Sequence, residues 1–165
     1  MTTTELTELR KKHLPEDYKS LSYTTEQFEN DHLIIRGFEN NQLKYVLSFK
    51  DGVKDGIFEV YYDNGQLNIL MNYVNGKKDG LYETWYEDGL RKSSSKFKEG
   101  MLISHHFYKS NQLITEAEVV DEKVIIRKWA LSGYMIKEYE CKYSDIQLLE
   151  NPIINTNQDI TVSLK

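Results

Sequence analysis

The chain of 165 residues contains a single cysteine, Cys141, so an intramolecular disulfide framework is excluded. Cys141 lies in an alternating apolar–polar run, which favours a small buried side chain over a reactive nucleophile. No apolar run approaches the roughly 18 residues of a membrane-spanning helix, and residues 1–14 lack the apolar stretch of a secretory signal. We therefore expect a cytoplasmic protein.

Basic residues are also few. Lys and Arg number 21 against 26 Asp and Glu, which gives a net charge of −5. Nucleic-acid binding requires a basic stripe, and attachment to an anionic membrane surface requires clustered Lys and Arg. The charge balance therefore predicts no nucleic-acid partner and disfavours binding to a membrane. We expect the partner to be another protein.

Catalytic and metal-binding motifs are missing as well. The sequence has no HExxH, CxxC, nucleophile elbow or phosphate-binding loop. His105 and His106 are adjacent, so in a strand they would point to opposite faces and could not share a metal ion. We expect no cofactor, no metal and no catalytic residue, and hence a protein that is not an enzyme.

What the chain does have is a repeated phrase. Residues 54–77 and 78–101 align at an offset of 24, and both begin with Lys-Asp-Gly. A weaker copy precedes them in residues 38–53, and two further copies follow at an offset of 22. Such a period is typical of repeat architectures, whose end units diverge because they face solvent instead of a neighbour.

Each unit has the pattern of a β-hairpin. Asn64-Gly65 separates two runs of alternating apolar and polar residues, which predicts a two-residue type I′ turn. The resulting register pairs Asp63 with Gln66, Tyr62 with Leu67, Val60 with Ile69 and Phe58 with Met71. One face of the hairpin is then apolar, and the other carries Glu59 and Tyr61.

The predicted fold is mainly β: a single-layer, elongated, twisted antiparallel meander of about five hairpin repeats, with ten strands in residues 31–143. Asp-Gly and Asn-Gly pairs supply the tight links between successive hairpins. Residues 1–30 are expected to form a capping segment with a short helix over 4–14. Residues 144–165 are expected to be a tail with a possible edge strand.

The stretch Lys92-Ser93-Ser94-Ser95-Lys96 does not fit a dry core. Two interpretations remain open from the sequence. Either this strand is fully solvated, or a partner covers it.

The second face of the predicted sheet repeats a carboxylate and a large aromatic residue. The candidate partner-binding residues on it are Tyr61, Trp85, Phe107, Trp129, Glu59 and Glu83. The aromatic column has two interpretations, a second packing layer within the chain or an exposed stripe that anchors a partner. Glu59 and Glu83 are better explained as solvent-facing charges than as a catalytic pair.

The phrase YYDNGQLNILMNYVNGKKDGLYETWYEDG, residues 61–89, resembles bacterial MORN-variant repeats. Their pattern is an aromatic pair, an Asn-Gly-Gln-Leu turn, another aromatic residue, Asn-Gly-Lys and Asp-Gly. The resemblance implies a meander of hairpins, in agreement with the pattern above. It also implies an antitoxin-like or immunity-like protein that binds and occludes a cognate toxin.

The alternative is a structural scaffold or interaction module without a toxin partner. A lipid-binding role, which has been suggested for MORN repeats in general, is disfavoured by the acidic balance.

Overall fold

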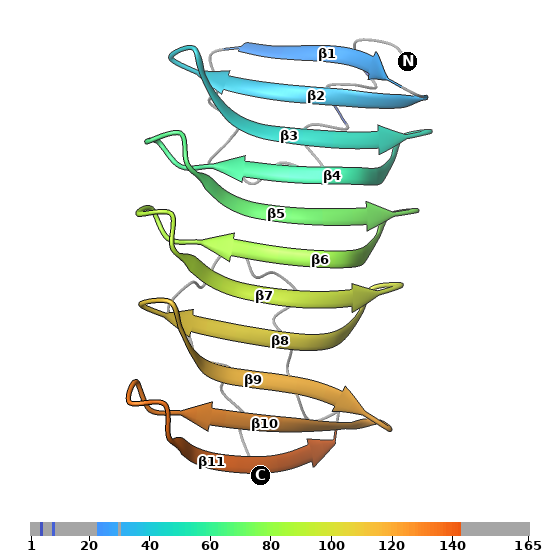
Figure 1. Ribbon diagram of the computed structural model, residues 1–165. Coiled ribbons are helices and arrows are strands. Elements are labelled where there is room, and N and C mark those ends of the chain that lie inside the picture. The colour runs from blue at the N-terminus through green and yellow to red at the C-terminus, as the bar shows by residue number, and fades with distance from the viewer. Residues whose placement is uncertain (1–3, 5–7, 9–22, 30, 143–165) are drawn as a thin grey trace.

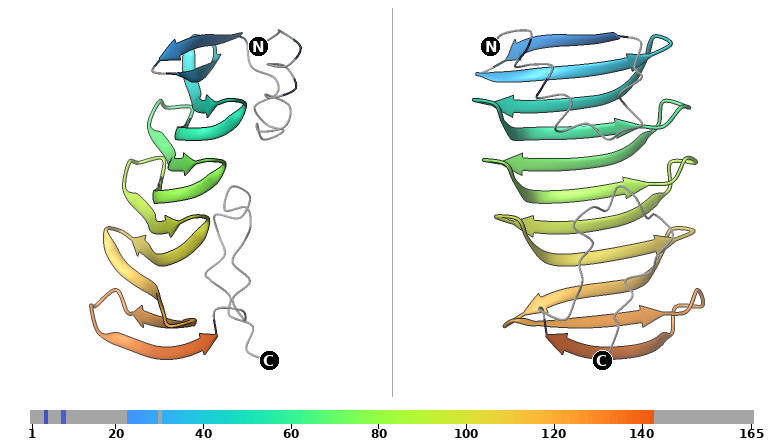
Figure 2. Two further views of the ribbon diagram at one scale, coloured as in Figure 1. Left: turned by 90° about the vertical axis from the view of Figure 1, so that its right-hand side faces the viewer. Right: turned by 180° about the vertical axis from the view of Figure 1, so that it is seen from behind.

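The computed structural model describes residues 4, 8, 23–29 and 31–142. Eleven β-strands form one antiparallel sheet whose strand order follows the sequence (Figure 1). The strands are β1 (Tyr23–Glu29), β2 (His32–Glu39), β3 (Gln42–Lys50), β4 (Val53–Tyr61), β5 (Leu67–Val74), β6 (Lys77–Trp85), β7 (Arg91–Lys98), β8 (Met101–Lys109), β9 (Gln112–Val120), β10 (Lys123–Trp129) and β11 (Met135–Lys142). Figure 2 shows that the described strands form one curved layer.

The predicted open antiparallel meander is confirmed, but the predicted start of the sheet is wrong. The sheet begins at Tyr23, because β1 pairs with β2 from Tyr23↔Phe38 to Glu29↔His32. The capping segment therefore contributes an eleventh strand. Residues 23–29 carry none of the glycines of the repeated phrase, but pairing needs only the backbone ladder and a strand-compatible sequence.

The predicted helix over 4–14 and the predicted tail over 144–165 lie outside the described residues, apart from Thr4 and Glu8. No helix among the described residues is long and apolar enough to span a membrane.

Two kinds of turn join the strands, a two-residue turn and a three-residue loop. The two-residue turn does not lie at Asn64-Gly65, where the sequence predicted it. At Asn75-Gly76 both residues have positive φ, 49° and 78°, which is the signature of a two-residue type I′ turn. The loop after β4 instead contains three residues: the Gly65 N–H donates to Tyr62 O at 2.9 Å and the Tyr62 N–H donates to Gln66 O at 2.8 Å. Within this loop only Gly65 has positive φ, so the predicted type I′ turn at Asn64-Gly65 is wrong.

Side-chain hydrogen bonds explain why Asn64 prefers the longer loop. Its Oδ1 accepts from the Gln66 N–H at 2.9 Å, and its Nδ2 donates to Glu87 O of the next loop at 2.6 Å. The asparagine thus closes its own turn and ties that turn to the following repeat.

The register also shifts near the turn. Phe58↔Met71 and Val60↔Ile69 pair as predicted, but the next pair is Tyr61↔Leu67 instead of Tyr62↔Leu67. A β-bulge separates the last two pairs. The same shift precedes the loops of the hairpins β2–β3, β6–β7, β8–β9 and β10–β11. Together with β4–β5, we name these the long hairpins.

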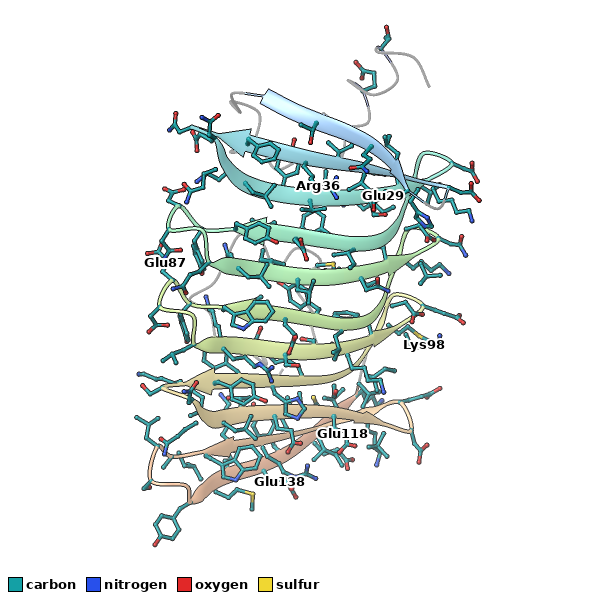
Figure 3. The ribbon with its side chains drawn as sticks, turned by 45° about the horizontal axis from the view of Figure 1, so that its top comes forward. Glu29, Arg36, Glu87, Lys98, Glu118 and Glu138 are labelled. Carbon is teal, nitrogen blue, oxygen red and sulfur yellow. The ribbon has the colours of Figure 1, made fainter. Side chains whose placement is uncertain are left out.

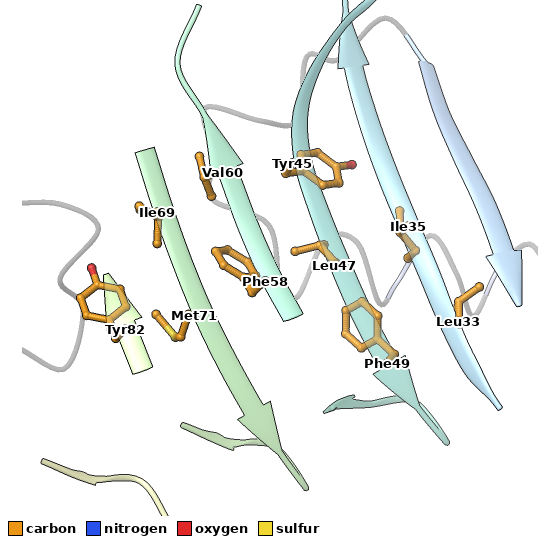
Figure 4. Packing of buried hydrophobic residues seen from close by; sticks show 10 residues of the cluster. All are labelled: Leu33, Ile35, Tyr45, Leu47, Phe49, Phe58, Val60, Ile69, Met71 and Tyr82. Carbon is orange, nitrogen blue, oxygen red and sulfur yellow. The ribbon is translucent and has the colours of Figure 1, made fainter. Parts of the chain in front are cut away.

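One face of the sheet, which we name the core face, holds the buried apolar side chains. The main cluster lies on β2–β6, and Figure 4 shows its members: Leu33, Ile35, Tyr45, Leu47, Phe49, Phe58, Val60, Ile69, Met71 and Tyr82. A smaller cluster of Ala117, Val124 and Ile126 lies on β9 and β10. Each such side chain contributes about 1.5–3 kcal/mol when it is fully buried, with alanine contributing less.

The serine stretch of β7 lies between these two clusters and is not fully solvated. Ser93 and Ser95 are only 7% and 4% exposed. Ser93 Oγ lies 2.7 Å from Thr84 Oγ1, and Ser95 Oγ lies 2.7 Å from His105 Nδ1. Cross-strand hydrogen bonds therefore satisfy hydroxyl groups that burial would otherwise leave unpaired at a cost.

The repeated lysine of the Lys-Asp-Gly phrase covers aromatic rings of the core face. Lys54 Nζ lies 5.2 Å from the centroid of Phe58 and 4.9 Å from that of Tyr73. Lys78 repeats this arrangement over Tyr82 and Phe97, at 5.6 and 5.1 Å. Burial lowers the pKa of both lysines. Cation–π attraction compensates part of that desolvation.

The repeated aspartate binds the turn that follows its own hairpin and leads to the next repeat. Asp55 accepts a hydrogen bond from the Asn75 N–H at 2.9 Å, and Asp79 accepts one from the Glu99 N–H at 3.1 Å. These backbone hydrogen bonds lower the pKa of both carboxyl groups. We expected the Asp-Gly pairs in the links between hairpins, but they lie inside β4 and β6, where Gly56 has a φ of 92° at an irregularity in the pairing.

We predict that Gly37→Ala lowers the free energy of unfolding by about 1–3 kcal/mol or more. Gly37 pairs with Tyr45, and a Cβ at position 37 would clash with the Tyr45 ring, which is 1% exposed. Urea unfolding measures the change. In a Tyr45→Leu background the same glycine substitution should cost less, since the obstructing ring is gone. An equal cost in both backgrounds would contradict the steric explanation.

The stability of the core face should depend on pH through His105. Burial, with a smaller contribution from His106, lowers the pKa of His105 to about 4. An unfolded chain has a histidine pKa of about 6.5, so between these values the unfolded state binds more protons. The free energy of unfolding should therefore fall as the pH drops through this window. His105→Gln should show a shallower fall in urea unfolding, and an unchanged slope would rule out His105 as its source.

Candidate protein-binding surface

Each long hairpin carries an aromatic residue at the same position, next to its β-bulge. The residue that follows the register shift is Phe38, Tyr61, Trp85, Tyr108 or Trp129, on β2, β4, β6, β8 and β10. All five residues are half-buried. We name this set the aromatic column.

The column lies on the face opposite the core face, which we name the second face. Tyr61 Oη donates a hydrogen bond to Glu59 Oε2 at 2.8 Å. Glu59 pairs with Leu70, and Leu70 pairs in turn with Glu83, so all three residues share this face. Burial, assisted by Glu59, raises the pKa of Tyr61 to about 12, so its hydroxyl remains a donor at neutral pH.

The structure brings Tyr61, Trp85 and Trp129 to equivalent positions, but not Phe107. Phe107 pairs with Ser93 and Thr115 on the core face, and Tyr108 occupies the column position. The prediction that Phe107 belongs to the column is therefore wrong.

The cause is the size of the pairing irregularity earlier in β8. Between Met71↔Tyr82 and Tyr73↔Lys78, β6 uses two more residues than β5. Between Lys96↔Ser104 and Phe97↔Leu102, β8 uses only one more than β7. Because β8 has one extra residue where β6 has two, the column position is reached after 23 residues from Trp85, at Tyr108, instead of after 24. The loss of Asp-Gly from this unit was the signal in the sequence.

Hydrogen bonds between repeats support the same equivalence. Tyr62 Oη donates to the carbonyl oxygen of Trp85 at 2.7 Å, and Tyr86 Oη donates to that of Tyr108 at 3.2 Å. In each case the tyrosine after one column residue holds the backbone of the next. The spacing of the column is thus fixed by contacts between neighbouring repeats.

Glu59 and Glu83 are each engaged by a neighbouring side chain. Glu59 accepts the Tyr61 hydroxyl, and Glu83 Oε1 lies 3.1 Å from Arg91 Nη2. They lie two strands apart, which corresponds to about 9.6 Å between their backbones.

Towards the carboxyl-terminal strands the second face becomes a network of ion pairs, in the region of the labelled Glu118 and Glu138 (Figure 3). Arg127 Nε lies 2.6 Å from Glu138, and Arg127 Nη1 lies 3.3 Å from Glu116. His106 Nε2 reaches Glu116 at 3.3 Å. These partly exposed pairs border the column with charged groups.

The described part of the chain contains no group of three or more His, Cys, Asp or Glu side chains arranged to hold a metal ion. A shallow hollow adjoins the last column residue. It is lined by Gln112, Leu113, Trp129, Ala130 and Gly133.

Comparison with known families matches the MORN repeat variant to residues 54–75. The chain carries a MORN repeat variant. The matched segment contains Lys54 over its two rings, the Asp55 hydrogen bond to the next turn, and the column residue Tyr61. The MORN-variant phrase therefore encodes contacts within one repeat and one unit of the aromatic column.

No curated protein matches the chain. Among solved structures, one match comes from the crystal structure of accessory secretory protein 1, 2 and 3 in Streptococcus pneumoniae, with 10% identity and a TM-score of 0.25. The match covers 73% of this chain and 23% of that chain. A likeness at this level says nothing about the function of this chain.

We predict that Tyr62→Phe destabilises the protein by about 0.5–1.5 kcal/mol, the usual contribution of one hydrogen bond. The substitution removes the hydroxyl that donates to the Trp85 carbonyl oxygen and leaves the ring in place. Urea unfolding gives the change, and Tyr86→Phe, which removes the longer bond to Tyr108, is the matched comparison and should cost less. An unaltered midpoint for Tyr62→Phe would show that this contact does not hold neighbouring repeats together.

Proposed function

We propose that the protein is a non-catalytic protein-binding module, and that it binds its partner with the aromatic column and the flanking Glu59 and Glu83. The observation that carries the proposal is the repetition of a half-buried aromatic residue in five hairpins of one sheet face. Aromatic anchors bordered by charged groups are the usual energetic centres of protein interfaces. MORN repeats are interaction repeats, which agrees with this role.

We further propose that the partner is a cognate protein toxin in the cytoplasm, which this chain neutralises by occlusion. The resemblance to antitoxin-like MORN-variant proteins supports this identity. Steric block requires a preformed surface and no chemistry. The inter-repeat bonds of Tyr62 and Tyr86 favour such a surface, because they fix the column before a partner arrives.

A scaffold that self-associates is the second candidate, and the edge strand β11 favours it. Tyr134 and Ile136, at the start of this hairpin arm, are 77% and 68% exposed, and Leu131 and Met135 beside them are also exposed. Among the described strands, β1 and β11 each pair on one side only. An edge with exposed apolar residues is a template for pairing with another chain. Light scattering across a concentration series separates the candidates, since only the scaffold predicts growing oligomers.

The proposed interface predicts a large effect of Trp85→Ala. The partner is first obtained by co-expression with the product of the adjacent gene and co-purification. Trp85→Ala should then weaken the complex by about 2 kcal/mol or more in calorimetry, as expected for a central aromatic anchor.

Leu81→Ala is the matched control. Leu81 lies on the same strand and face, and it is 54% exposed, but it lies outside the column. Its truncation should leave the affinity nearly unchanged. Equal effects of the two substitutions, or no effect of Trp85→Ala, would remove the column from the binding site.

A further inference from the structure

We propose that the aromatic column binds an extended, proline-rich and basic segment of the partner, which runs along the column in the polyproline II conformation. This inference rests on the proposed function, because it concerns the same surface. It is carried by the spacing of the column and by the charges beside it.

The spacing follows from the fold. Column residues lie on every second strand, β2, β4, β6, β8 and β10. Neighbouring strands lie about 4.8 Å apart, so successive column positions are about 9.6 Å apart. A polyproline II helix rises about 3.1 Å per residue with three residues per turn, which gives about 9.3 Å per turn. One residue per turn therefore meets one aromatic ring.

Other regular conformations match this spacing less well. Two turns of α-helix span about 10.8 Å, so the mismatch accumulates to about 5 Å over four steps of the column. For polyproline II the corresponding mismatch is about 1.2 Å. A β-strand returns to the same face after about 6.8 Å or about 13.6 Å, and neither distance fits. Aromatic-lined grooves are a known mode of polyproline II recognition, since this conformation is preformed and loses little entropy on binding.

The charges beside the column define the second property of the segment. Residues 59–66 and 83–92, which contain Tyr61 and Trp85, hold five carboxylates and two cations. One of these cations, Lys92, is buried over the ring of Tyr86, and the other, Arg91, pairs with Glu83. Lys44 reaches Asp63 from β3. An excess of negative charge remains around Tyr61 and Trp85, and it complements arginines on a separate edge of the segment.

Two synthetic peptides test the inference. The first, (Pro-Pro-Arg)5, combines the polyproline II conformation with five positive charges. The second, (Gly-Ser-Arg)5, has the same length and charge but is flexible. Both tryptophans of the chain, Trp85 and Trp129, belong to the column, so intrinsic fluorescence reports directly on its occupation.

We expect (Pro-Pro-Arg)5 to change the fluorescence saturably and to bind at least tenfold more tightly than (Gly-Ser-Arg)5. In Trp85→Ala, followed through Trp129, the affinity should fall at least tenfold, and in Leu81→Ala it should stay within twofold. Equal affinities for the two peptides, or binding that ignores Trp85→Ala, would overturn the inference.

Competition with the natural partner separates this inference from the proposed function. A partner that depends on Trp85 but is not displaced by (Pro-Pro-Arg)5 would overturn the polyproline II segment and leave the binding surface intact. A partner that is indifferent to Trp85→Ala would overturn the surface itself. Displacement by (Pro-Pro-Arg)5 and not by (Gly-Ser-Arg)5 supports both.

Discussion

The alternation of side chains along β2, β4, β6, β8 and β10 is the constraint on which the second face depends. A strand alternates its side chains between two faces, so a residue that directly follows a core-face residue occupies the second face. In β4, Tyr61 directly follows the core residue Val60, and the extra residue of the β-bulge, Asn68, lies in the partner strand β5. Alternation lets one short sequence supply both a continuous apolar core and a repeated aromatic position.

The described strands form one layer, so stability depends on contacts between adjacent repeats. Asp55 accepts from the backbone of the next turn, Tyr62 from one repeat donates to the backbone of the next, and Lys54 covers two rings of its own hairpin. Each contact lies within one repeat or joins it to its nearest neighbour. Such an array gains stability by the sum of its units and interfaces, which explains why weaker units are tolerated beside strong ones.

Alternation along the strands was sufficient to predict the meander, the core face and the pairs Phe58↔Met71 and Val60↔Ile69. The lengths of the loops and the positions of the β-bulges were harder to predict from the sequence. A glycine indicates that positive φ is required, but it does not say whether the loop has two or three residues, and this misplaced Tyr62. The prediction that Phe107 belongs to the column was wrong for a related reason. The size of a pairing irregularity depends on both strands together, and a repeat offset read from one strand does not reveal it. β1 was missed because its pairing depends on backbone groups that every sequence has.

Some features of the repeat are lost in the weaker units, whereas the aromatic residue of the column is kept in all five long hairpins. This contrast bears on the role of the column. The Asp-Gly pair is present in β4 and β6, whereas β8 and β10 lack it. The glycine that closes a three-residue loop occurs at three of the five long hairpins, at Gly65, Gly89 and Gly133. An aromatic residue nevertheless follows the bulge in all five. If the rings served only to support the Asp-Gly and glycine-loop geometry, they would be dispensable where that geometry is absent. Their persistence in β2 and β8 is better explained by a contact that runs along the whole face, which is what an elongated partner would make.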